Sequence, residues 1–231
     1  DIVVTAQKRS ESINRVGMSI TAATGDQLIA RGVTDPSQLA KIVPGFVFNN
    51  TVYGSPVYTI RGVGFQESSL AASPTVSVYV DEVPIPFPAE TLGASLDLER
   101  VEVLKGPQGT LYGQNSTGGA VNYIAAKPTD HLEMGVNGSY GRFNTADISG
   151  FVSGPVAGNL TSRLAFRYLR GDAWQESVSR PGDKLGRVDQ LFGRWLTEWK
   201  PVDGLKVSLN LNGWRDHSDS PVIFLSPSRS S

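Results

Sequence analysis

A dense group of charged side chains lies on and beside one predicted strand near the middle of the chain. Glu99, Arg100, Glu102 and Lys105 fall within the run 98–105, in which apolar and charged residues alternate as in a strand. Opposite charges of this kind can form buried pairs that are close to neutral for stability yet fix a position. A solvated sheet edge has the same pattern, so both interpretations stay open.

Patterns typical of catalysis are incomplete in this sequence. The glycine-rich run 113–119 has Gly119 where a phosphate-binding loop needs lysine. The run 62–64 lacks the third glycine of a dinucleotide fingerprint, because Glu67 stands there. His131 and His217 lie far apart, and neither has a neighbouring nucleophile. We therefore expect no enzyme, no catalytic residue, no metal site and no cofactor.

The bulk composition narrows the class of protein. The 231 residues carry a net charge of −1, which gives no reason to expect a nucleic-acid partner. The absence of cysteine rules out a disulfide framework. No apolar run approaches the roughly 18 residues of a spanning helix, although barrel strands would give the same weak hydropathy signal. No leader pattern is present, so we expect a mature chain or a fragment.

The first part of the chain, to about residue 128, mixes short helices and strands. Residues 25–31 predict a short helix that ends at Gly32, and Asp35-Pro36 predicts the start of a second helix. The run 76–80 places valine at every second position, as in a strand with one buried face. The pattern predicts a small α+β domain.

From about residue 131 the sequence alternates between apolar and polar residues, with glycine-rich turns. This pattern predicts about five strands. Their ranges are 131–141, 144–154, 159–171, 187–200 and 205–216. Such alternation fits a soluble sandwich as well as a membrane barrel, because the apolar face can meet either a second sheet or lipid.

The connections between these strands favour the barrel. The turns at 155–158 and 201–204 are tight, whereas 172–186 forms a long polar loop, an asymmetry typical of outer-membrane barrels. Trp195 and Trp199 share a face, as an interfacial aromatic girdle would. The fourth strand is irregular, because Phe192 and Leu196 fall on its predicted polar face.

Several segments, in the correct order, resemble the family of TonB-dependent outer-membrane transporters. The block 98–119, with its strand and two glycine turns, is similar to the signature near the end of the family's plug domain. The runs 57–64 and 75–81 resemble the strands that precede it, and the opening run 1–6 resembles a TonB box. The resemblance covers about the first 128 residues.

The resemblance implies an α+β plug domain followed by the antiparallel transmembrane strands of a β-barrel. We expect the TonB box at 1–8, the plug at 9–128 and the first barrel strands at 129–231. The family barrel has roughly twenty-two strands, and about five cannot close, because open edges in lipid leave backbone groups unpaired. The chain is therefore expected to be truncated at Ser231.

The TonB box is expected to bind the coupling protein TonB by strand addition, in which main-chain hydrogen bonds carry the pulling force. Its high strand propensity suits this role, although the same run could be the first strand of the domain itself. The predicted TonB-binding residues are Ile2, Val3, Val4, Thr5 and Ala6.

The family also implies a role for the charged group, whose counterparts pair with the inner barrel wall and hold the plug in place. The predicted lock residues are Arg61, Glu99, Arg100, Glu102 and Lys105. Departures from the family pattern weaken this expectation at particular positions.

Lys105 and Gln114 stand where arginine is common, which puts bidentate contacts in doubt. Asp81-Glu82 replaces the family's Asp-Gly turn, and because Glu82 does not tolerate positive φ as glycine does, we expect a different turn type.

Ligand contacts are expected from the outer loops of the plug, which are rich in amides, hydroxyls and aromatic rings. The predicted ligand-binding residues are Asn50, Thr51, Tyr53, Phe65, Gln66, Ser68 and Phe87. These types favour a polar or aromatic ligand over a strongly anionic ferric chelate. Arg163, Arg167 or Arg194 on the barrel wall would reverse that inference if they faced the ligand.

The resemblance implies TonB-dependent uptake of a scarce nutrient across the outer membrane of a Gram-negative bacterium, with the plug gating the barrel. Siderophores, cobalamin, glycans and small aromatics are all possible substrates. The implied partners are TonB with ExbB and ExbD, outer-membrane lipid and the small-molecule substrate. Two alternatives stay open: a signalling receptor of the same fold, and a soluble plug-like ligand-binding module with a β-sandwich behind it.

Overall fold

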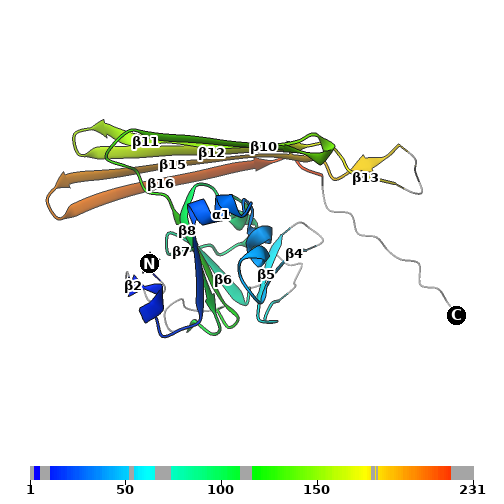
Figure 1. The fold of residues 1–231 in the computed structure, drawn as a ribbon, viewed down its shortest axis with the longest axis horizontal. Coiled ribbons are helices and arrows are strands. Elements are labelled where there is room, and N and C mark those ends of the chain that lie inside the picture. The colour runs from blue at the N-terminus through cyan, green and yellow to red at the C-terminus, as the bar shows by residue number, and fades with distance from the viewer. Residues whose placement is uncertain are drawn as a thin grey trace.

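The computed structural model describes residues 3–5, 11–51, 55–65, 74–109, 116–177, 180 and 182–219. They form a small α+β unit and a five-stranded antiparallel sheet that lies along one side of it. In Figure 1 the sheet is the long flat layer at the top and the α+β unit lies below it. We call the first unit the plug and the sheet the wall. The two-part organisation expected from the sequence is therefore present.

The centre of the plug is a mixed sheet with the strand order β3-β8-β9-β6-β7. Its strands are β3 (Ile20–Thr24), β8 (Leu98–Lys105), β9 (Gly119–Ala125), β6 (Val76–Val80) and β7 (Val83–Pro84). Only the β6–β9 pair is parallel among these described strands. Strands buried on both faces favour continuous β-branched runs, and β9 is buried at every position.

The two faces of this sheet bury different parts of the chain. One face carries Val101, Val103 and Val121 and packs into the main core. The opposite face carries Leu104 and Ala120, which pack with Val4 from the start of the chain. The N-terminal segment therefore covers the second face of the plug sheet.

Short helices and a hairpin cover the main core. They are α1 (Gly25–Ala30), η2 (Pro36–Lys41), η3 (Pro88–Gly93) and the hairpin of β4 (Phe46–Asn50) with β5 (Pro56–Ile60). A capping box between Thr24 and Gln27 begins α1. The predicted helix end at Gly32 is confirmed by its φ of 60°. The second predicted helix is also present, but as a 3-10 helix, with the Asp35 carboxylate accepting the Ser37 N–H at 2.8 Å.

The remaining short elements lie at the start of the chain and at the ends of the wall. They are β1 (Val3–Val4), β2 (Glu11–Ser12), η1 (Ile13–Arg15), η4 (Arg142–Asn144), β13 (Gln175–Glu176) and β14 (Lys184–Leu185). β1 pairs antiparallel with β2. β13 and β14 form a hairpin inside the predicted long loop 172–186. Among the described residues, no helix has the length and apolar character needed to cross a membrane.

The wall is an antiparallel meander with the order β10-β11-β12-β15-β16. Its strands are β10 (Glu133–Gly141), β11 (Thr145–Ala157), β12 (Leu160–Gly171), β15 (Val188–Val202) and β16 (Leu205–Asp216). These match the predicted ranges within a few residues. The tight turns are shorter than predicted, because β11 and β15 continue into them.

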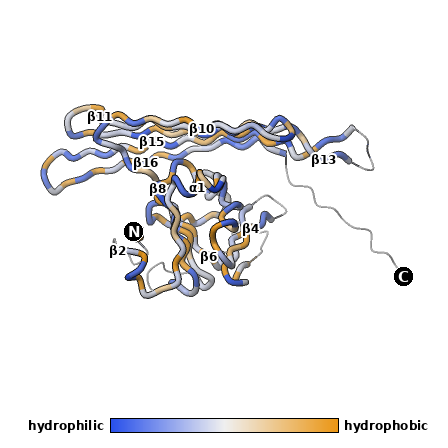
Figure 2. Tube along the Cα trace, viewed as in Figure 1, coloured by the Kyte–Doolittle hydropathy of each residue, from blue (hydrophilic) through white to orange (hydrophobic). Residues whose placement is uncertain are grey.

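The apolar face of the wall points away from the plug and is open. Its members are Met134, Val136, Tyr140, Ile148, Val152, Leu164, Phe166, Leu191, Trp195, Trp199, Val207, Leu209 and Leu211, all at least 41% exposed. Figure 2 shows hydrophobic positions recurring along the wall strands as well as inside the plug. A sandwich would turn this face onto a second layer, so within the described residues that alternative is wrong.

The opposite face of the wall meets the plug. Phe192 and Leu196, which break the alternation of β15, are 5% and 3% exposed. Phe192 forms a small apolar cluster with Leu96 and Ala165. Phe192 gives the irregularity of this strand a physical cause, because its ring packs with Leu96 of the plug where a water-filled lumen would favour a polar side chain.

The Asp81-Glu82 turn corrects one expectation. Both residues have positive φ, 49° and 67°, which is the geometry of a type I′ turn and not of a different type. Tertiary hydrogen bonds offset the strain: the Glu82 N–H donates to Asn122 Oδ1 at 3.3 Å, and the Asp81 N–H donates to the Tyr123 carbonyl at 2.9 Å. Asp81 also accepts from the Ala125 N–H at 3.1 Å.

Candidate functional site

Three buried arginines on the inner face of the wall hold the plug. We call their contacts with the plug the seam. Arg163 on β12 makes a bidentate pair with Asp97, with Nε to Oδ2 at 2.6 Å and Nη2 to Oδ1 at 2.7 Å. Its guanidinium also lies 3.7 Å from the centroid of the Phe151 ring. Such planar bidentate pairs are directional as well as strong, so this contact fixes the orientation of the plug at Asp97.

Arg167 lies four residues further along β12, on the same face of the strand. Asp147 on β11 accepts from its Nε at 2.9 Å and from its Nη2 at 2.8 Å. Arg167 donates in turn to the Thr34 carbonyl and, at 3.2 Å, to the Thr34 hydroxyl. The Asp147 carboxylate thus orients the Arg167 guanidinium, which binds the loop after α1 through Thr34.

Arg194 on β15 binds the backbone just after η3. It is 4% exposed and donates to the carbonyls of Leu96, Asp97 and Ala94, the last two at 3.3 and 3.5 Å. Asn212 on β16 accepts from its Nε at 2.7 Å. Ala94 is the C-cap residue of η3, and Leu96 and Asp97 follow it, so Arg194 supplies donors to backbone carbonyls that lie outside the helix.

Further contacts extend the seam. Asn210 on β16 donates to Asp81 Oδ2 at 3.0 Å, at the strained plug turn. Within the plug, Lys127 also pairs with Asp81, at 2.7 Å. Gly93 lies against the wall, where an added Cβ would lie 3.5 Å from the Trp214 ring and 3.6 Å from the Phe192 ring.

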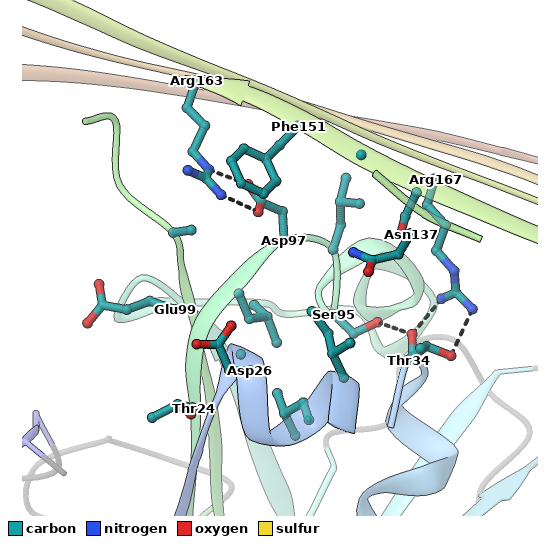
Figure 3. Close-up of a pocket in the computed structure, with 18 of the residues that line it drawn as sticks. Thr24, Asp26, Thr34, Ser95, Asp97, Glu99, Asn137, Phe151, Arg163 and Arg167 are labelled. Atoms are coloured by element: carbon teal, nitrogen blue, oxygen red, sulfur yellow. Dashed lines mark hydrogen bonds and ion pairs between the residues drawn. The ribbon is translucent and has the colours of Figure 1, made fainter. Parts of the chain in front are cut away.

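A cavity of about 380 Å³ lies between α1, the start of β8 and the wall. Figure 3 shows the Arg163–Asp97 and Arg167–Thr34 contacts beside it, with Asp26 and Glu99 on the plug side. The residues that line this cavity carry charges of both signs. The seam is therefore a discontinuous contact with space beside it and not a sealed core.

Two predicted lock residues bind the start of the chain. The Thr5 N–H donates to Glu102 Oε1 at 2.8 Å, and the Thr5 hydroxyl donates to the same carboxylate at 3.3 Å. Arg100 Nε donates to Glu102 Oε1 at 2.8 Å, and Arg100 also pairs with Glu99. Among the described residues, these partners all lie within the plug. Pairing of Glu99, Arg100 and Glu102 with the barrel wall stays a prediction.

The other two predicted lock residues lie on a different part of the plug. Arg61 donates from Nη2 to the Ser19 hydroxyl at 2.8 Å. Partial burial lowers the pKa of Lys105, and the nearby positive charge of Arg61 lowers it further. Their contact with the wall also stays a prediction.

The predicted TonB-binding residues that the structure describes form a docked strand. Val4 is fully buried and packs with Tyr79, Leu104 and Ala120. Val3, by contrast, is 49% exposed. Ile2 and Ala6 lie outside the described residues.

The predicted ligand residues are spread over separate loops. Asn50 ends β4 and is exposed, as are Phe65 and Phe87. Thr51 is buried, and its hydroxyl accepts the Ser55 N–H at 3.1 Å, which gives it the role of closing the β4–β5 loop. Tyr53, Gln66 and Ser68 lie outside the described residues. Ligand contact by this set stays a prediction.

The sequence pattern did not identify the wall arginines as holders of the plug. Arg163, Arg167 and Arg194 were considered only as residues that could face a ligand. Their position on the polar face of apolar-alternating strands was the available signal, because a barrel interior filled by a plug needs fixed partners there. Several of their acceptors on the plug are backbone carbonyls, those of Thr34, Ala94, Leu96 and Asp97, which a sequence does not single out.

Comparison with known proteins agrees with this arrangement. The profile of the "TonB-dependent Receptor Plug Domain" matches residues 12–120. The pesticin receptor of Yersinia pestis is 34% identical over 172 residues, which is 69% of this chain and 24% of that receptor. The vitamin B12 transporter BtuB of Vibrio vulnificus is 27% identical over 94% of this chain and 35% of its own.

A solved structure extends the match to the wall. The ferric yersiniabactin uptake receptor FyuA from Yersinia pestis superimposes with a TM-score of 0.73 at 26% identity, covering 80% of this chain and 29% of that one. The chain belongs to the TonB-dependent receptors, which are outer-membrane proteins of Gram-negative bacteria. It spans about a quarter of the length of the pesticin receptor.

Proposed function

We propose that this chain is the plug and part of the wall of a receptor that takes up a scarce nutrient across the outer membrane by active, TonB-dependent transport. The observation that carries this proposal is the plug bound to the inner face of a sheet whose outer face is apolar and open. An apolar outer face suits lipid, and a plug bound within suits a gate. The family supports a transport receptor over an enzyme.

The wall strands are proposed to be part of a closed barrel of roughly twenty-two strands. In lipid, unpaired backbone groups at an open edge cost several kcal/mol each, so a meander of five strands needs neighbours on both edges. The plug would be reached from the periplasm, and the β13–β14 side of the wall would face outward. The tight turns at 157–160 and 202–205 support this orientation.

Coupling is proposed to occur at residues 2–6. TonB would add a strand to this segment, and the proton gradient, through ExbB and ExbD, would supply the pull. The exposed Val3 and the two-stranded pairing of β1 with β2 support a segment that can exchange partners. Movement of the plug would then open a path beside the seam.

The nutrient is proposed to be a metal chelate such as a siderophore, or cobalamin. The names of relatives support this class: a ferric yersiniabactin receptor, pyoverdine receptors and a vitamin B12 transporter. Glycans and small aromatics are less well supported. The wall arginines bind the plug here, so the uncharged residues Asn50, Phe65 and Phe87 still argue against a strongly anionic chelate and favour a siderophore complex of low charge or cobalamin.

The test is nutrient uptake by the full-length receptor in cells with and without TonB. A panel of labelled ferric siderophores and cobalamin identifies the substrate by TonB-dependent accumulation. Val4→Pro removes the N–H and the extended pairing of the predicted TonB box, so uptake of that substrate should fall to the level of cells without TonB. Val3→Thr, which keeps strand propensity, is the matched control and should transport normally.

Uptake that does not depend on TonB, or normal uptake by Val4→Pro, would contradict the proposal. Binding of the nutrient to Val4→Pro cells should be unchanged, since the predicted ligand loops lie elsewhere in the plug. This separates a coupling defect from a folding defect.

A further inference from the structure

The segment that carries Thr5 is attached to the plug through a buried carboxylate. Glu102 is fully buried on β8, and its Oε1 accepts both the Thr5 N–H and Arg100 Nε at 2.8 Å. The Thr5 hydroxyl, with its single proton, lies 3.3 and 3.4 Å from the two carboxylate oxygens and donates to this carboxylate. Arg100 Nη2 lies 3.5 Å from the Thr5 hydroxyl.

Arg100 compensates the negative charge of Glu102 independently of Thr5. Arg100 is 9% exposed and bridges Glu102 to the half-exposed Glu99, so the guanidinium is held from two sides. A buried carboxylate with a fixed cationic partner is a preorganised acceptor, and a backbone N–H bound to it is held more strongly than one bound to a carbonyl.

The bond occupies an atom that strand addition needs. An incoming strand forms main-chain hydrogen bonds with the N–H and carbonyl groups of the segment that it joins. At Thr5 the Glu102 carboxylate takes the position of such a partner. Val4, the residue before Thr5, is buried in the plug, so its side chain is also unavailable to an incoming strand.

We propose that Glu102, positioned by Arg100, is a latch that holds the N-terminal strand on the plug and limits its availability to TonB. This inference rests on the proposed function. TonB and Glu102 compete for the same donor, the backbone N–H of Thr5. β8 also links the latch to the seam, because Asp97, which directly precedes β8, is bound by Arg163 of the wall.

The test measures exposure of a buried thiol in the full-length receptor, without TonB and without nutrient. Val4→Cys places a small apolar thiol in the Val4 pocket, and maleimide labels it only when the strand leaves the plug. Adding Glu102→Gln replaces a charged acceptor with a neutral one. The labelling rate should rise on the order of tenfold, the difference between a charged and a neutral hydrogen bond.

Glu99→Gln is the matched control. It removes a carboxylate that also pairs with Arg100 but is half-exposed, whereas the carboxylate that binds Thr5 in the described part of the chain is that of Glu102. Its labelling rate should stay within about twofold of the parent, as expected for an exposed ion pair. Equal acceleration by both substitutions would overturn the latch, because it would assign the effect to the charge of Arg100 alone.

A second reporter excludes general loosening of the plug. This reporter is Val103→Cys. Position 103 lies on β8, but its side chain faces the main core, away from Thr5. Its thiol should stay protected when Glu102→Gln is added. An unchanged rate at position 4, or equal acceleration at positions 4 and 103, would refute the proposal. Because no TonB or transport is involved, the outcome is independent of whether uptake is observed.

Discussion

The start and the middle of β8 differ in what they are attached to, and the difference indicates which part of the plug moves first. Near Glu102 the N-terminal strand is held by one buried valine, one carboxylate and its short pairing with β2. At Asp97 the plug is held by Arg163, and its neighbours are held by Arg194. A pull on the N-terminus therefore meets the weaker attachment first.

The expected energies of the two attachments support this order of release. Burial of Val4 contributes about 1.5–3 kcal/mol, and a hydrogen bond to a charged group contributes about 1.5–3 kcal/mol. The seam combines three buried arginines with several acceptors each and an apolar cluster around Phe192. Breaking one buried pair alone costs about 3–5 kcal/mol when one partner is left behind. Several such contacts must fail together for the plug to leave the wall.

The largest expected effect comes from breaking the seam. Arg163→Ala leaves the Asp97 side chain, which is 11% exposed, without its bidentate partner, so the full-length receptor should lose about 3–5 kcal/mol of plug attachment. The plug should loosen and admit solutes passively. Entry of a large antibiotic normally excluded by the outer membrane, measured as growth inhibition, checks this outcome.

Glu133→Gln is the control for that substitution. Glu133 also pairs with Arg163, but at 3.7 Å and with a side chain that is 45% exposed. It should leave antibiotic resistance unchanged. If both variants leak equally, the bidentate pair is not what holds the plug.

A smaller effect is expected at the other attachment. Val4→Ala removes two buried methyl groups and should weaken docking of the N-terminal strand by about 1–3 kcal/mol. Recovery of the receptor by immobilised TonB without nutrient should increase accordingly. Val3→Ala, at a half-exposed site, should change recovery little. Increased leakage in Val4→Ala would show that the two attachments are not separate.

Substitutions at Asp97 can distinguish the effect of its carboxylate from the effect of backbone strain at the seam. Its φ is 47°, a conformation that costs a β-carbon-bearing residue about 1–2 kcal/mol but costs glycine nothing. Asp97→Gly and Asp97→Ala both remove the carboxylate. Thermal unfolding of the full-length receptor should show the alanine variant as the less stable by about 1 kcal/mol. Equal stabilities would mean that this backbone position adds no strain.

The smallest effect is expected in the core, away from both attachments. Burial raises the pKa of Tyr58 to about 12, and its hydroxyl donates to Thr91 at 3.0 Å. Because the folded pKa is the higher one, this contribution to stability is complete below pH 10 and is lost as the pH rises from 10 to 12.

Tyr58→Phe should cost about 1 kcal/mol at pH 7 through loss of the hydrogen bond. It should also remove a decline of about 1.4 kcal/mol per pH unit between pH 10 and 12. Unfolding of the variant and the parent receptor at several pH values gives the difference. A parallel decline in both would contradict the assignment. Antibiotic entry and TonB recovery should stay unchanged.

Local patterns were sufficient to predict most of the fold. Alternation located the five wall strands within a few residues, and Asp35-Pro36 and Gly32 marked helix ends, because these signals act within a few residues of the chain. The Asp81-Glu82 turn was predicted wrongly. Its strain is offset by Asn122 and Tyr123, which lie about forty residues away and are brought close by β9.

The partners of the charged residues were beyond a sequence reading for the same reason. The Thr5–Glu102 contact spans 97 residues, and the Arg194–Leu96 contact spans 98. Backbone carbonyls, such as that of Leu96, carry no residue-type signal. A charged pattern thus indicates that partners are needed, while the fold decides which ones are used.

The most direct test of the account compares two buried thiols in the full-length receptor in living cells. Val4→Cys reports the N-terminal strand, and Ala165→Cys, on the inner face of β12, reports the seam. With nutrient and energised TonB, labelling at position 4 should rise strongly while position 165 stays largely protected. Earlier or equal labelling at position 165 would contradict the claim that the strand leaves the plug before the plug leaves the wall.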